Sequence, residues 1–247
     1  MGFLRLRISA RAYLTFAMVA LSASSAFAQT KQQFDWCVNN GNVFAPDLQI
    51  DGCTAAIDSG RWSGGDLASA YNSRCQAYNN KRDYDHAVQD CSAAIKLKPL
   101  AIYLENRGNV YLSKGDYDSA IADYTAAIKI VPNADAYSGR CQSRALAGDE
   151  MMKALQDCNE ALAFKPDDAK ALNSRGLVEL KLGMYYQAIA DYDAAVAQNP
   201  KDAASLYARG VAKVRNFDKT GGGEVDIAAA KTIDPNVADE SARLGVK

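Results

Sequence analysis

Small and large side chains alternate along the chain at the spacing of packed helices. From residue 87 onward, a small residue, a large residue or cysteine, and an alanine recur four and three positions apart, and a proline follows five positions later. Residues at these offsets share one face of an α-helix, and a proline beyond the helix end cannot continue it. The copies are Ala87-Cys91-Ala94-Pro99, Ala120-Tyr124-Ala127-Pro132, Ala154-Cys158-Ala161-Pro166, Ala188-Tyr192-Ala195-Pro200 and, more weakly, Gly223-Ile227-Ala230-Pro235.

The pattern has a regular period. The five prolines are 33, 34, 34 and 35 residues apart. Another helical segment precedes each copy, with an arginine before a small residue or cysteine, and Gly115, Gly148 and Gly183 lie at expected helix ends. Each unit is therefore predicted to be a helical hairpin of about 34 residues.

This pattern resembles the tetratricopeptide repeat (TPR) family. The phrases Asn106-Arg-Gly-Asn-Val-Tyr111 and Gly115-Asp-Tyr-Asp-Ser-Ala-Ile-Ala-Asp-Tyr124 look like an exported bacterial branch of that family, here with intra-repeat cysteine pairs. The chain departs from the family in having Arg where the family has Leu. The resemblance implies an all-α, right-handed α-solenoid of stacked helix-turn-helix hairpins. The expected divisions are a divergent hairpin at 29–66, five repeats within 67–236 (67–100, 101–133, 134–168, 169–202 and 203–236) and a capping tail at 237–247.

The first 28 residues have the pattern of a signal peptide. Arg5, Arg7 and Arg11 precede an apolar run, and the sequence Ala26-Phe27-Ala28 follows as a cleavage site. The apolar run is short for a membrane span, so a cleaved signal is favoured over an N-terminal anchor. We expect a periplasmic or secreted protein with no integral membrane segment after cleavage.

The six cysteines occur in register. The spacing from Cys37 to Cys53 and from Cys75 to Cys91 is 16 residues, and from Cys141 to Cys158 it is 17. Elsewhere the first position is Gly and the second is Tyr or Ile, which indicates that the two positions face one another. An exported chain favours disulfides at these three pairs. Six buried free thiols are the alternative.

Each repeat also has a charged pair in register. The predicted pairs are Arg74–Asp90, Arg107–Asp123, Arg140–Asp157, Arg175–Asp191 and Arg209–Asp226. The N-terminal hairpin has Trp36 and Gly52 at these positions and so lacks both partners, which favours a salt bridge within each hairpin. A row of arginines that binds an anionic ligand is the alternative.

The TPR resemblance also implies a binding groove. In that family the first helices line a concave face and take a partner segment there. The positions carried over as candidate groove residues are Asn72, Gln76, Glu105, Asn106, Asn109, Gln142, Lys170, Asn173, Leu177, Tyr207 and Val211. Their amides suit the backbone of an extended peptide, and the apolar residues suit its side chains.

These features favour a binding protein over an enzyme. The net charge of −1 gives no basic surface for nucleic acid. The chain has a single histidine, His86, and each cysteine pair lies in a different hairpin. This pattern predicts no catalytic residue, no metal and no cofactor. The sequence predicts an exported adaptor or scaffold for a protein or peptide partner. The alternative is an accessory subunit or a small-ligand or glycan-binding module of an envelope enzyme system.

Overall fold

The computed structural model describes residues 32–38, 43–148, 150–217 and 219–246, and the regular structure within these ranges is helical. The predicted signal peptide, residues 1–28, lies outside the described residues. Residues 32–38 form one helical segment. The helices that follow are α2 (Pro46–Asp58), α3 (Gly64–Asn80), α4 (Tyr84–Leu97), α5 (Ala101–Lys114), α6 (Tyr117–Ile130), α7 (Ala134–Ala147), α8 (Met151–Phe164), α9 (Ala169–Lys181), α10 (Tyr185–Gln198), α11 (Ala203–Arg215), α12 (Gly222–Ile233) and α13 (Val237–Arg243).

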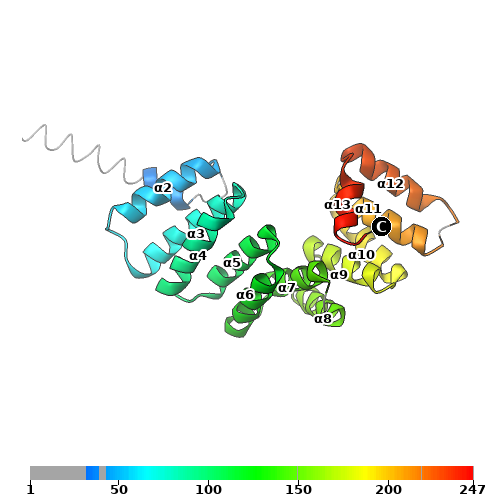
Figure 1. Cartoon of the computed structure of the whole chain (residues 1–247), viewed down its shortest axis with the longest axis horizontal. Helices are drawn as coiled ribbons and strands as arrows, with labels where there is room; N and C mark the ends of the chain where they lie inside the picture. The colour runs from blue at the N-terminus through cyan, green and yellow to red at the C-terminus, as the bar shows by residue number, and fades with distance from the viewer. Residues whose placement is uncertain (1–31, 39–42, 149, 218, 247) are drawn as a thin grey trace, which may run out of the picture. The chain divides into compact units, whose positions relative to one another are not determined.

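The helices form two compact units, residues 1–98 and 99–247. In the first unit, α3 packs on both α2 and α4. In the second unit, helices α5 to α12 pack as consecutive hairpins, and each hairpin also contacts the next through its second helix (Figure 1). The predicted all-α class and the stacking of adjacent helix pairs are confirmed.

The helices begin and end where local chemistry dictates. Asp116 accepts a hydrogen bond from the backbone N–H of Ser119 at 3.2 Å, and the Asp168 side chain accepts from two backbone N–H groups at the start of α9. These carboxylates satisfy backbone donors that a helix start leaves without partners. Gly115 and Gly148 end α5 and α7 with φ of 84° and 85°, a conformation that disfavours any residue with a Cβ.

The alanines of the repeat pattern form the contact between paired helices. Ala120, Ala154 and Ala188 are each 0% exposed, near the starts of the second helices α6, α8 and α10. A methyl side chain at this point lets two helix backbones approach closely, so the pattern read from the sequence is a packing pattern.

The chain folds back after α12. Val237 at the start of α13 is 2% exposed, and Val246 is 3% exposed. Leu244, within the predicted capping tail, is 40% exposed. Gly245 has φ of 84°, and this turn directs Val246 rather than Leu244 inward.

Candidate partner-binding face

The three predicted cysteine pairs lie at disulfide distance. Their Cα–Cα separations are 4.4 Å for Cys37–Cys53, 5.4 Å for Cys75–Cys91 and 5.3 Å for Cys141–Cys158, within the range that a disulfide spans. Each pair joins the two helices of one hairpin. Every cysteine is at most 1% exposed, so the bonds lie inside the hairpins and away from any partner.

Glycine and a large side chain occupy the same two positions in the other hairpins. A Cβ on Gly108 would lie 3.1 Å from the Tyr124 ring, and one on Gly176 would lie 2.9 Å from the Tyr192 ring. The prediction that these two positions face one another within a hairpin is therefore confirmed. Tyr124 also lies beneath Gly139 of the next hairpin, so its ring fills space in two hairpins at once.

The five predicted arginine–aspartate pairs all meet. Each guanidinium donates two hydrogen bonds, from Nε and Nη2, to the two oxygens of its aspartate at 2.6–2.9 Å. The five aspartates are 3–7% exposed. The hydrogen bond to Asp90 raises the pKa of Arg74 above its ordinary value, and Arg107, Arg175 and Arg209 are shifted likewise by their own aspartates. Such two-point pairs are typical of structural contacts.

The arginines also join neighbouring hairpins, a contact that was not predicted from the sequence. Arg140 Nη1 donates to Thr125 at 3.1 Å, and Arg175 Nη1 donates to Asn159 at 2.9 Å. Both acceptors belong to the second helix of the preceding hairpin. Two further contacts follow the same rule, Arg74 to Thr54 and Arg209 to Asp193. The signal in the sequence was a polar residue directly after the large residue or cysteine in each second helix that another repeat follows.

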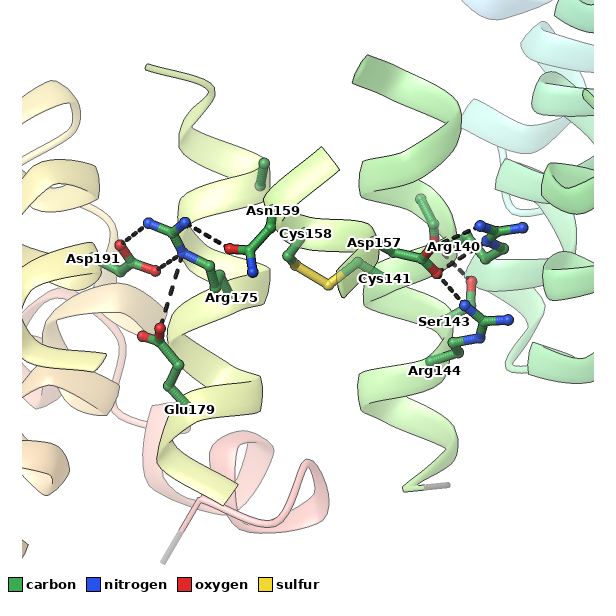
Figure 2. Close-up of a disulfide and its surroundings, with 12 residues drawn as sticks. Arg140, Cys141, Ser143, Arg144, Asp157, Cys158, Asn159, Arg175, Glu179 and Asp191 are labelled. Carbon is green, nitrogen blue, oxygen red and sulfur yellow. Dashed lines mark hydrogen bonds and ion pairs between the residues drawn. A yellow bond between two sulfur atoms is a disulfide. The ribbon is translucent and has the colours of Figure 1, made fainter. Parts of the chain in front are cut away.

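In three of the five pairs, the residue one helical turn after the arginine is charged and changes the local charge. Arg144 joins Arg140 on Asp157, and Lys213 joins Arg209 on Asp226 (Figure 2 shows the first of these clusters). Burial by itself raises the pKa of Asp226, but hydrogen bonds from the two cations outweigh it and leave that pKa below its ordinary value. Two cations on one buried acid are favourable only while the acid keeps its charge.

The third cluster has the opposite composition, with two acids around one cation. Glu179 lies 4.0 Å from Arg175 Nε, but both oxygens of Asp191 already accept from that guanidinium (Figure 2). Glu179 is 6% exposed, and its Oε2 has no hydrogen-bond partner among the described residues. Burial, and secondly the nearby Asp191 carboxylate, raise the pKa of Glu179 to about 7. Tyr192 of α10 lies in the same environment, and burial raises its pKa as well.

The raised pKa of Glu179 predicts a stability that falls as pH rises. The folded protein holds this proton up to about pH 7, whereas an unfolded Glu releases it near pH 4.3. The free energy of unfolding is therefore highest, as far as Glu179 is concerned, below about pH 4.3. It falls as pH rises from there to about pH 7. We expect Glu179→Gln to increase the stability of the α9–α10 hairpin at pH 8 by about 2 kcal/mol and to change it little at pH 5.

Thermal unfolding at pH 5 and pH 8 measures this effect. Glu160→Gln is the matched control, because Glu160 is exposed on α8. An equal response of both variants at both pH values would contradict the assignment to Glu179.

The first helices of the second unit share one face. Helix α7 contacts α5 and α9, and α9 contacts α11, whereas the second helices α6, α8, α10 and α12 make no such contacts with one another in the described residues. The hairpins are therefore closer together along their first helices, and that side is the inner side of the stack. We call the open surface of α5, α7 and α9 that carries Ile102, Asn109, Asp135, Gln142 and Lys170 the inner face. All five side chains are exposed.

The predicted groove residues fall into three groups. Asn109, Gln142 and Lys170 are exposed on the inner face, and Asn106 is half-buried beside them. Asn72 and Gln76 lie on α3, which belongs to the first unit. The remaining five, Glu105, Asn173, Leu177, Tyr207 and Val211, are buried or packed against other hairpins.

The residues of the third group are covered by other parts of the protein and are not open to a partner. Glu105 is 6% exposed and accepts a hydrogen bond from Asn133 Nδ2 at 2.8 Å, next to the start of α7. Asn173 accepts from the Ser205 hydroxyl at 2.7 Å and so ties α9 to α11. Val211 is 5% exposed in the same apolar cluster as Val246. The sequence could not reveal this, because the covering groups come from other parts of the chain.

Sequence comparison identifies the repeats. A tetratricopeptide repeat profile matches residues 101–143 and 169–202, and a second profile of the same description matches residues 68–99. The chain is a tetratricopeptide repeat protein. No curated protein sequence is significantly similar to it.

Solved TPR structures share the fold at low sequence identity. A TPR protein from Parabacteroides merdae is 15% identical, with a TM-score of 0.66 over 89% of this chain and 90% of that one. MamA from Desulfovibrio magneticus is 20% identical, with a TM-score of 0.59 over 70% of this chain and 98% of that one. YrrB, described as a TPR protein with an unusual peptide-binding site, is 19% identical, with a TM-score of 0.56 over 78% of this chain and 99% of that one. At these identities the likeness establishes the fold.

The family sets the general class of function. TPR proteins are typically non-catalytic scaffolds, and the repeat points to a protein partner. Within the part of the chain that the structure describes, no helix combines the length and the apolar character that a membrane crossing requires.

Proposed function

We propose that this TPR protein is an exported adaptor that binds an extended segment of a partner protein on its inner face. The observation that carries the proposal is the contact between successive first helices of the second unit. Ile102, Gln142 and Lys170 are exposed on three of these helices. One apolar, one amide and one cationic side chain can contact the side chains and backbone of an extended peptide. The peptide-binding site named for YrrB lends further support by analogy of fold.

Capture of the partner tests this proposal. Ile102→Ala, Gln142→Ala and Lys170→Ala together remove three exposed side chains with little effect on packing. We expect the triple variant to retain a tenth or less of the partner that the unaltered protein captures from an envelope extract, since each lost contact weakens binding by about 1 kcal/mol. Mass spectrometry of the captured proteins gives the measurement.

A second triple variant controls for the removal of exposed side chains from another part of the surface. Gln156, Glu160 and Gln187 are exposed on the second helices α8 and α10, away from the inner face. Their joint replacement by Ala is expected to leave capture unchanged. If this control loses the partner and the inner-face variant keeps it, the partner binds on the second helices. If purified protein instead binds cell-wall fragments in calorimetry, the ligand-binding alternative replaces the adaptor.

The export part of the proposal rests on the N-terminal sequence and on the three cysteine pairs. Disulfides persist in oxidising compartments outside the cytoplasm, which agrees with the signal peptide pattern of residues 1–28. We expect the protein recovered from the periplasm or medium to begin at Gln29 and to carry six cysteines without free thiols. Intact mass before and after reduction with alkylation tests both points. Retention of residues 1–28 in the mature protein would refute cleavage.

A further inference from the structure

The segment that follows α12 reaches back along the stack. Val237, at the start of α13, packs in one apolar cluster with Leu206 of α11 and Ala230 of α12. This first contact covers the end of the last hairpin, as the open end of a solenoid requires. The residues after α13 are not needed for that cover.

Those later residues lie against the first helices instead. Val246 is 3% exposed in the apolar cluster that contains Leu180 of α9 and Val211 of α11. Gly245 lies beside the Lys181 side chain, which extends from α9: an added Cβ would be 3.2 Å from Lys181 Cε. Figure 1 shows α13 beside α11, and Figure 2 shows the same segment, in faint red, near the end of α9 beyond Glu179.

This placement explains why the apolar part of the predicted groove is closed. Leu177 and Tyr207, which the sequence assigned to partner side chains, pack against the same cluster as Val246. The chain therefore places one of its own aliphatic side chains at the position that a partner side chain was expected to take.

The contact has few anchors. From Val237 to Val246, three residues are buried, namely Val237, Ser241 and Val246. Among the described residues, no side-chain hydrogen bond or ion pair links residues 238–246 to α9 or α11. A seven-residue helix has little stability of its own. The end of this segment is therefore attached mainly by the burial of Val246.

We propose that Gly245 and Val246 form an internal ligand of the first helices α9 and α11, and that a protein partner binds there by placing an aliphatic side chain where Val246 now lies. The proposal rests on the partner-binding function proposed above and extends it to a second contact, next to the inner face. The matching partner segment is a helical turn closed by glycine and followed by valine or isoleucine, because that is the shape the site already accepts.

Binding of the chain's own segment in trans tests the proposal. The probe is a fluorescent peptide with the sequence of residues 236–247, and fluorescence polarisation measures its affinity for the full chain. In the Val246→Asp chain the internal segment cannot bury its last side chain. We expect this chain to bind the peptide at least about tenfold more tightly than the unaltered chain does. A peptide that carries the same Val246→Asp change is expected not to bind.

Leu244→Asp provides the matched control, since Leu244 is 40% exposed two residues away. This chain is expected to bind the peptide as weakly as the unaltered chain. Equal affinity of the Val246→Asp and unaltered chains, with unchanged circular dichroism, would overturn the proposal.

A measurement on the unaltered chain covers the case in which Val246→Asp misfolds. Excess unlabelled peptide should move the Val246 methyl signals of the isotope-labelled chain to the positions of a free segment. Methyl signals that stay in place at the highest soluble peptide concentration would refute displacement. The peptide test uses no partner protein and no residue of α5 or α7, so a negative result leaves the adaptor proposal open. A failed partner capture, in turn, leaves the result of the peptide test unaffected.

Discussion

Changing Asp157 to Asn is expected to lower the free energy of opening the α7–α8 hairpin by about 3–5 kcal/mol. Asp157 is 3% exposed and accepts hydrogen bonds from both Arg140 and Arg144. The side chains of these two arginines are 14% and 13% exposed. An amide in place of the carboxylate leaves two poorly solvated cations next to each other, which is costly in a partly buried site. Glu150 stays 3.5 Å from Arg144 Nε, but its side chain is 46% exposed, so it offsets little of this cost.

Hydrogen exchange of the α7 and α8 amides measures this local free energy without assuming that the chain unfolds as one unit. Asp193→Asn is the matched control. Asp193 also accepts from an arginine, Arg209, at 2.9 Å, but its side chain is 54% exposed and Arg209 keeps Asp226. We expect a loss of less than about 1 kcal/mol for this exposed pair. Similar losses for the two variants would show that burial does not govern the strength of these pairs.

Loss of the Cys75–Cys91 bond is the second large expected effect. The bond closes a loop of 16 residues between α3 and α4. In the loop-entropy account, closing such a loop stabilises the folded hairpin by about 3 kcal/mol. The double variant Cys75→Ala and Cys91→Ala is therefore expected to lower the opening free energy of α3 and α4 by at least this amount, as measured by hydrogen exchange in oxidising buffer.

The chain itself suggests a control that separates the covalent link from side-chain packing. Three other hairpins carry glycine and a large residue at these positions, as Gly108 and Tyr124 show. Cys75→Gly with Cys91→Tyr should restore much of the lost packing without the bond, and so be more stable than the double alanine variant. Addition of a reductant should destabilise the unaltered α3–α4 hairpin and leave both variants unchanged. No effect of the reductant on the unaltered protein would mean that the cysteines are free thiols.

The sequence was sufficient for the features that repeat. The cysteine register, the glycine positions opposite Tyr124 and Tyr192, and the arginine–aspartate offsets all follow from one hairpin geometry, which a period near 34 residues reveals. Several copies restrict each position more than a single hairpin would. The helix ends followed from prolines and glycines, which act over one turn.

The sequence was insufficient where distant segments meet. The arginine contacts to the preceding hairpin and the burial of Glu105 depend on how hairpins stack. The closure of the site around Val211 depends on a segment 35 residues later in the chain, which the repeat pattern does not include. The charge of the Glu179 cluster was visible in the sequence, one turn after Arg175, but its consequence required the burial that the structure provides.

The most direct test of the account is to find where the partner touches the protein in intact cells. A photo-crosslinking amino acid at position 142 lies on the inner face, and one at position 160 lies on the second helix α8. We predict that position 142 gives a covalent adduct with an envelope protein after illumination and that position 160 does not. Adducts from position 160 with none from position 142 would contradict partner binding on the inner face.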